Sequence, residues 1–182
     1  MPIALDPVLI HVASAVLGAI FLAGALDKFK DRHLFIGVVQ AYGLLPVPLV
    51  VVFAFLVASA ELGIGLALWV PASWPAAQVA GIGLLAVVTA AVVINLLRGR
   101  TELSCGCGGA SADQQLSWSL VARNAALAAL LLSATAMPVA RELTVLDYGT
   151  IALGTCVGFG LYAALNQLLA NAPRLASLGV SG

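Results

Sequence analysis

The chain has 182 residues, of which 62% are hydrophobic and 9% are charged, and its mean hydropathy is +1.10. Soluble domains contain about 45–50% apolar and about 25% charged residues, so this composition excludes an ordinary soluble protein and predicts an integral membrane protein. The formal net charge is zero. No basic surface is therefore available to neutralise phosphates, and we expect no nucleic-acid partner.

Five apolar runs are long enough, at about 20 residues each, to cross a bilayer. We therefore predict an all-α, polytopic membrane helical bundle with a four-helix core plus one further helix. The first run has neither the basic start nor the cleavage site of a signal peptide, so we expect it to be retained as a membrane helix. The predicted spans of this single membrane domain, 1–182, are 7–26, 47–70, 76–97, 120–140 and 148–170.

The segment 34–45, between the first two spans, is too short to cross the membrane. It mixes apolar with small or polar residues and ends at Pro46. Such a segment is typical of an amphipathic helix that lies at the membrane surface.

Three predicted spans contain a side chain that is unusual at that depth. Glu61 costs about 2.5–3.5 kcal/mol to insert, so it should face the bundle interior and be paired or protonated, either to handle protons or a partner or to join two helices. We expect Arg123 to snorkel to the membrane surface; the alternative is that it points inward and lowers the pKa of a nearby thiol. Cys156 is expected to be an inert, small apolar residue, with a redox role as the alternative.

The longest polar interval, the loop 98–118, contains the sequence Cys105-Gly-Cys107. Gly106 lets the backbone bend enough to bring the two sulfurs within disulfide distance. A strained, easily reduced disulfide suits thiol exchange and not a structural clamp. Arg98 and Arg100, which precede the pair, would favour the reactive thiolate.

The same two thiolates could instead bind a soft metal such as Cu(I), Zn(II) or Hg(II). A closed zinc site needs four ligands, and the further candidates are only His33 and Cys156. A third reading, a pair of idle cysteines in a turn, is disfavoured because serine or alanine would serve a turn without the risk of oxidation.

The distribution of lysine and arginine predicts the orientation of the bundle. The first and third loops and the tail, which share one face in a five-span protein, contain most of these residues: Lys28, Lys30, Arg32, Arg98, Arg100 and Arg174. The positive-inside rule therefore places the cysteine loop at the cytoplasmic face and the N-terminus outside.

Several motifs resemble those of the MauE family of methylamine-utilisation proteins, which are relatives of the DoxX-like membrane proteins. The principal motifs are Leu-Leu-Arg-Gly-Arg at 96–100, Cys-Gly-Cys-Gly-Gly at 105–109 and Val-Ala-Arg-Asn-Ala at 121–125. Weaker matches are Gly-Ala-Leu-Asp-Lys at 24–28, Tyr-Gly-Leu-Leu-Pro at 42–46 and Glu-Leu-Gly-Ile-Gly at 61–65.

The resemblance implies a protein of the bacterial inner membrane that works with a thioredoxin-like partner in disulfide formation, as in maturation of a disulfide-rich amine dehydrogenase subunit. Cys105 and Cys107 would be the exchange pair. The implied partner is periplasmic, which conflicts with the charge count; a re-entrant loop, allowed by the uncharged segment 103–112, would reconcile the two.

We therefore predict a membrane thiol–disulfide oxidoreductase that passes electrons from a thioredoxin-like partner to an acceptor in the membrane, with quinone as one candidate. One alternative is a soft-metal binder or transporter, with Cys156 and Glu61 along the path. The other is a structural membrane anchor for a maturation complex.

Overall fold

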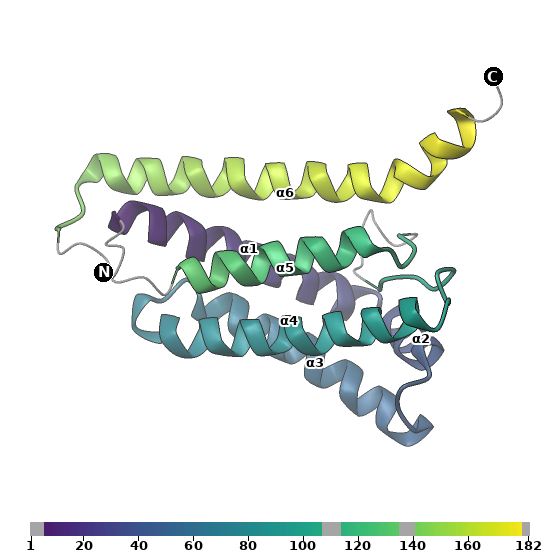
Figure 1. The fold of residues 1–182 in the computed structure, drawn as a ribbon. Helices are drawn as coiled ribbons and strands as arrows, with labels where there is room; N and C mark the ends of the chain where they lie inside the picture. The colour runs from purple at the N-terminus through teal and green to yellow at the C-terminus, as the bar shows by residue number, and fades with distance from the viewer. Residues whose placement is uncertain (1–5, 107–113, 135–140, 180–182) are drawn as a thin grey trace.

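The computed structural model describes residues 6–106, 114–134 and 141–179, with side chains as far as residue 171. Within these ranges the chain forms α-helices, one 3-10 turn and no strand (Figure 1), so the predicted all-α class is confirmed. The helices are α1 (Pro7–Lys30), α2 (Arg32–Tyr42), α3 (Val47–Ala67), α4 (Trp74–Leu97), α5 (Trp118–Ser133) and α6 (Val145–Gly179).

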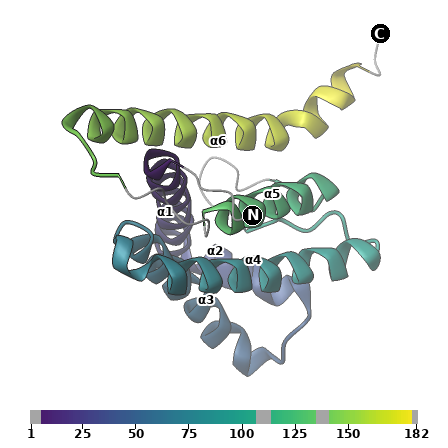
Figure 2. The ribbon, with the colours of Figure 1, turned by 60° about the vertical axis from the view of Figure 1, so that its left-hand side comes forward.

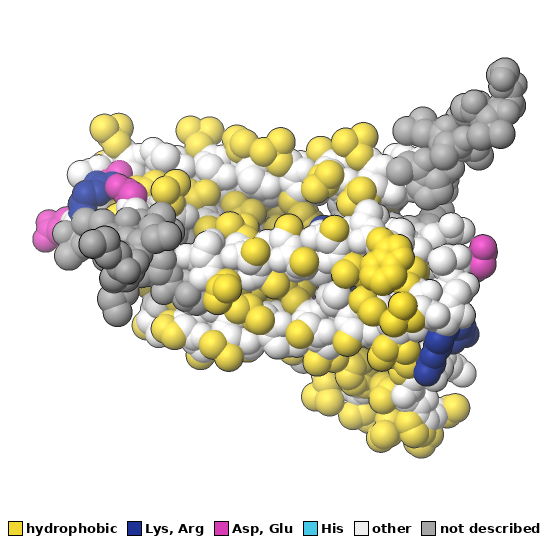
Figure 3. All heavy atoms as spheres, in the orientation of Figure 1, with side chains coloured by type: hydrophobic (Ala, Val, Ile, Leu, Met, Phe, Trp, Pro, Cys, Tyr) yellow, Lys and Arg dark blue, Asp and Glu magenta, His cyan; other side chains and the backbone are white. Residues whose placement is uncertain are grey.

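Four of the described helices are long and apolar enough to span a bilayer: α1, α3, α6, and α4 together with the short turn before it, η1 (Pro71–Ser73). Helix α5 is apolar but has 16 residues, about 24 Å at the rise of an α-helix. In the space-filling view, apolar side chains cover the flank of the molecule and charged side chains gather mainly at its two ends (Figure 3). The chain is a multi-pass membrane protein.

Two helix boundaries bear on the site. Helix α1 continues past the predicted span 7–26 to Lys30, so Lys28 is helical and not part of a loop. Helix α2 occupies most of the predicted surface segment 34–45, and Gly43 ends it in the left-handed conformation that glycine adopts without strain. The end of the predicted span 120–140 lies outside the described residues.

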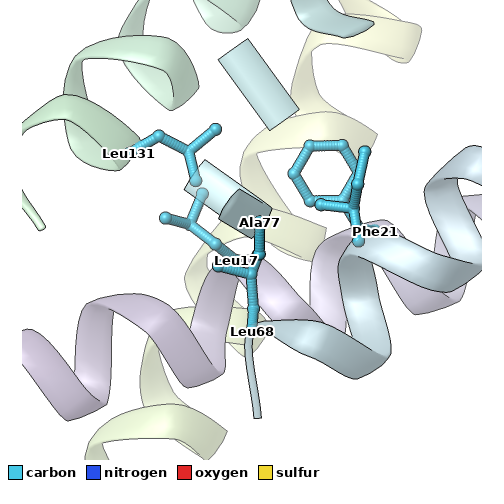
Figure 4. Packing of buried hydrophobic residues seen from close by; sticks show 6 residues of the cluster. Leu17, Phe21, Leu68, Ala77 and Leu131 are labelled. Atoms are coloured by element: carbon cyan, nitrogen blue, oxygen red, sulfur yellow. The ribbon is translucent and has the colours of Figure 1, made fainter. Parts of the chain in front are cut away.

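The centre of the bundle is an apolar cluster to which α1, α3, α4 and α5 contribute. It consists of Leu17, Phe21, Ile64, Leu68, Ala77 and Leu131 (Figure 4). Helix α1 packs closely on α3 because Gly65 leaves room for Leu22, whose Cγ lies 2.8 Å from the position that a Cβ would take. Small residues at such crossings let membrane helices approach.

Helix α6 forms a separate layer on top of α1 (Figures 1 and 2). Gly154 and Gly158 face Val12 and Val16 of α1, and a Cβ on Gly158 would come within 2.7 Å of the Val16 side chain. The arrangement agrees with the predicted four-helix core plus one added helix.

Candidate functional site

The described ends of the cysteine loop are joined to each other by two backbone hydrogen bonds. The Cys105 N–H donates to the carbonyl of Gln114 (2.8 Å), and the Leu116 N–H donates to the carbonyl of Leu103 (2.9 Å). Ser104 and Gln115 form the antiparallel bridge between them. Cys105 is therefore held at the neck of the loop, and residues 107–113 lie outside the described structure.

The neck folds back onto the bundle. Leu103 and Cys105 pack against a buried cluster made of Tyr42, Val92, Leu116 and Leu120. Val92 lies five residues before the end of α4 at Leu97, which is about 8 Å at about 1.5 Å per residue. The described part of the loop thus returns along α4 instead of extending away from the membrane domain.

Gly106 fixes the neck against α2. Its φ of 68° belongs to the left-handed region, and a Cβ there would lie 2.9 Å from Cγ1 of Val38 and 3.4 Å from Cδ2 of Phe35. The neighbouring Tyr42 hydroxyl makes a long hydrogen bond, 3.5 Å, to the carbonyl of Cys105. Burial raises the pKa of Tyr42 to about 12, so the phenol remains a donor at physiological pH.

Arg100 provides a second attachment between the loop and the end of α2. Its guanidinium donates to the carbonyls of Ala41 (2.9 Å) and Tyr42 (3.1 Å), and to Oδ1 of Asn95 (3.3 Å). The last carbonyls of a helix have no partner within the helix, so a cation placed there both bonds them and complements the helix dipole. Asn95 is itself fully buried and donates to the carbonyl of Ala91.

A cavity of about 100 Å³, called the polar cavity because charged side chains stand among its apolar lining, extends from Cys105 and Gly106 into the bundle. Lys28 and Glu61 form an ion pair on its wall, with Nζ and Oε2 2.8 Å apart and side chains only 9% and 13% exposed. The Lys28 ammonium also lies 5.3 Å from the centre of the Phe35 ring. The expectation that Glu61 is paired inside the bundle is confirmed, and its partner is a lysine from α1.

Arg123 lines the same cavity, so the prediction that it snorkels to the surface is wrong. Its guanidinium donates to Oδ1 of Asn166 (2.6 Å) and to Oδ1 of Asn124 (3.2 Å), and the Asn124 amide donates to Oγ1 of Thr89 (3.0 Å). These bonds join α4, α5 and α6. Two amide side chains inside the bundle thus accept the hydrogen bonds that a snorkelling Arg123 would donate to water.

Cys105 also lines a second, larger cavity, which is apolar and has a volume of about 360 Å³. Its walls come from α2, α3, α4 and the segment between α2 and α3. Val87, Ala90 and Ile94 of α4 are exposed on the outside of the bundle and form part of the lining. Cys105 therefore lies between a polar interior cavity and an apolar pocket at the flank.

The structure brings only some of the predicted site residues together. Cys105, Glu61 and Arg123 line one cavity. Cys105 is disulfide-bonded, and the predicted partner Cys107 lies outside the described residues. Cys156 is an exposed free thiol on α6 and lines neither cavity. His33 is exposed, and no three His, Cys, Asp or Glu side chains in the described part of the chain are placed to hold a metal.

The packing changes the charge count at the loop end of the bundle. Lys28 is paired inside with Glu61, and Arg100 is bonded to α2. Lys30, Arg32, Arg98 and Arg100 itself are exposed basic residues there. The excess of positive charge in water at this end is therefore smaller than the loop sequences suggest.

The residues that sequence reasoning missed are those that connect elements distant in the chain: Lys28, Tyr42, Asn124 and Asn166 in particular. Lys28 was assigned to a loop because it follows Asp27, at the end of the apolar run. A signal was available for Asn124, which is adjacent to Arg123 in a predicted span. Asn166 lies 43 residues after Arg123, and nothing in the local sequence links these two residues.

The chain is similar in sequence to known proteins of one family. Residues 6–137 match the family described as methylamine utilisation protein MauE. The chain is 38% identical to the methylamine utilization protein MauE of Paracoccus versutus, over 90% of this chain and 88% of that protein. It is 35% identical to the protein of the same name from Paracoccus denitrificans, over 90% and 89%. The corresponding protein of Methylorubrum extorquens is 36% identical, over 70% and 69%.

No solved structure matches the chain. The match of the family to most of the chain, together with relatives that align along most of their own length, establishes the relationship. The chain belongs to the MauE family of membrane proteins.

Proposed function

We propose that this protein is a membrane thiol–disulfide oxidoreductase of methylamine utilisation, in which Cys105 and Cys107 form the disulfide that exchanges with a thioredoxin-like partner. The observation that carries the proposal is the position of Cys105. It is disulfide-bonded at the neck of a loop and lines a cavity that contains three charged side chains.

The exchange needs two sulfurs close in the chain. A thiolate of the reduced partner attacks one sulfur of the Cys105–Cys107 disulfide, and a mixed disulfide forms while the other cysteine leaves as thiolate. The second thiolate of the partner then attacks the mixed disulfide. The partner ends oxidised, and both cysteines of this protein end reduced, ready to pass two electrons on.

The polar cavity contains both charges of an ion pair and one further cation. The Lys28 and Glu61 charges offset each other across 2.8 Å. Arg123 leaves a positive charge on the wall that Cys105 shares. A cation near a thiol lowers its pKa and increases the fraction in the reactive form.

The test is to trap the partner on the protein. A thioredoxin-like protein whose second cysteine is changed to serine should form a mixed disulfide with the wild type and with the control variant Cys156→Ser. Cys105→Ser combined with Cys107→Ser should form none. In the reduced protein, mild oxidation should restore a bond between Cys105 and Cys107 in peptide mapping by mass spectrometry.

Two results would overturn the proposal. One is that the Cys105–Cys107 bond never forms under mild oxidant. The other is that cells carrying serine at both positions still mature their disulfide-rich amine dehydrogenase normally, which is the result expected of a structural anchor. Labelling with a membrane-impermeant maleimide in whole cells and in inverted vesicles identifies the compartment that supplies the partner.

A further inference from the structure

We propose that the apolar pocket beside Cys105 binds the ring of a lipid-soluble quinone, which takes the two electrons from the reduced cysteine pair. The proposal rests on the proposed function, since it names the acceptor and the site for the second half of the same reaction. The observations that support it are different from those that support the exchange. They are the volume, lining and position of a pocket that thiol exchange with a soluble partner does not use.

The pocket has the size and chemistry of a small-molecule site. Its volume of about 360 Å³ lies within the range of about 300–1,000 Å³ that is usual for ligand pockets, which are mostly apolar with few polar groups. Three aromatic rings, those of Phe35, Tyr42 and Phe53, lie among aliphatic side chains. The polar groups are those of Tyr42 and Cys105, and both lie at the end where the loop neck packs.

One wall of this pocket comes from residues that are exposed on the outside of α4. Val87 is 50% and Ile94 39% exposed on α4, and Ala90, also exposed, lies between them. Since α4 is long and apolar enough to span the membrane, this face is in contact with lipid. A ligand that enters here must be lipid-soluble, which excludes a water-soluble oxidant.

The presence of Cys105 in the lining favours a quinone over a lipid chain as the occupant. An acyl chain needs apolar walls and no reactive group, whereas this pocket has a cysteine on its wall. The same cysteine also lines the polar cavity, so Cys105 lies between the two cavities.

The reaction balances without another reactant. The Cys105 thiolate adds to the quinone ring, and the Cys107 thiolate then attacks the Cys105 sulfur of that adduct. The sulfur–carbon bond breaks, the disulfide forms, and the electron pair stays on the ring. The two protons lost by the thiols are taken up by the ring oxygens, so one dithiol and one quinone give one disulfide and one hydroquinone.

The test uses the full chain carrying Cys156→Ser, in quinone-free lipid nanodiscs, reduced and freed of reductant. Decylubiquinone is added, and its ultraviolet absorbance is followed together with the number of free thiols. We expect one quinone reduced for every two thiols lost. Ala90→Phe fills the rim of the pocket and should slow the reaction by about tenfold or more, because it moves the ring away from the sulfur.

The matched control is Ala80→Phe, which is also exposed on α4 and lies about 15 Å further along the helix. Its rate should equal that of the parent. Oxidation by glutathione disulfide should be unchanged in both variants, which shows that the loop is intact. If glutathione disulfide fails to oxidise even the parent, the proposed exchange itself fails.

Three results overturn the quinone site while leaving the exchange in place. The parent is oxidised by glutathione disulfide but not by decylubiquinone; Ala90→Phe reacts with the quinone as fast as the parent; or native mass spectrometry finds phospholipid retained in the pocket and not displaced by the quinone.

Discussion

Gly106→Ala tests whether the loop neck is packed on α2 as described. Two costs add at this position. The positive φ of 68° costs an L-residue about 1–2 kcal/mol. The new methyl group would lie 2.9 Å from Cγ1 of Val38, and overpacking of this kind costs about 1–3 kcal/mol more. We expect a total loss of about 2–5 kcal/mol in the free energy of unfolding.

Gly99→Ala is the matched control, because Gly99 has a φ of 71° but no atom within 4 Å of the position of its Cβ. It should lose only the conformational cost, about 1–2 kcal/mol. The measurement is thermal unfolding in detergent micelles, followed by circular dichroism. The unfolding midpoint should fall by about 2–4 °C for each kcal/mol lost.

The double variant Val38→Ala with Gly106→Ala completes the cycle. Shortening Val38 removes the methyl group that the new Cβ meets, so the substitution at Gly106 should cost less in this background by about 1 kcal/mol or more. Equal losses for Gly106→Ala and Gly99→Ala, with no relief from Val38→Ala, would show that the neck does not pack on α2.

Three further predictions concern side chains around the site. Arg100→Ala should destabilise the protein by about 1.5–3 kcal/mol through loss of its charge-assisted hydrogen bonds, whereas Arg98→Ala, which is equally exposed but has no side-chain hydrogen bond to the described residues, should change stability by less than about 0.5 kcal/mol; thermal unfolding compares them. Lys28→Met should lower the free energy of unfolding by about 3–5 kcal/mol because it leaves Glu61 unpaired, and the double variant with Glu61→Gln should recover most of that loss. If the double variant is instead less stable than Lys28→Met alone, the two residues are not paired. Because burial raises the pKa of Tyr42 from 10.0 to about 12, its contribution to stability is complete below about pH 10 and is lost as the pH rises toward 12; unfolding midpoints should fall more steeply over this window in the wild type than in Tyr42→Phe.

Hydropathy was enough to predict the class of fold, because a helix is the simplest way to satisfy the backbone in lipid. The same physics predicted that Glu61 must be paired inside. It could not identify Lys28 as the partner, because the apolar run ends before that residue while helix α1 continues to Lys30. The contact that stabilises the carboxylate is set by how α1 crosses α3.

Arg123 shows where local rules fail. Its position near the start of a predicted span made the membrane surface the nearest source of hydrogen-bond partners. The structure provides partners inside instead, and one of them, Asn166, belongs to α6. Only the tertiary arrangement brings that amide next to the guanidinium. The anchoring of the cysteine loop by Arg100 and Tyr42 could not be predicted from the sequence for the same reason. Each of these two hydrogen bonds joins residues about sixty positions apart in the chain.

These attachments have a mechanical consequence. Arg100, Tyr42 and Gly106 all join the loop to α2, a helix of 11 residues with few buried side chains. Cys105 is thus attached on one side to a helix with few buried side chains, and on the other to the buried cluster that includes Val92 of α4 and Leu120 of α5. We expect a force that tilts α2, from a docking protein or from the thickness of the surrounding lipid, to strain the attachment of Cys105 while the central apolar cluster stays in place.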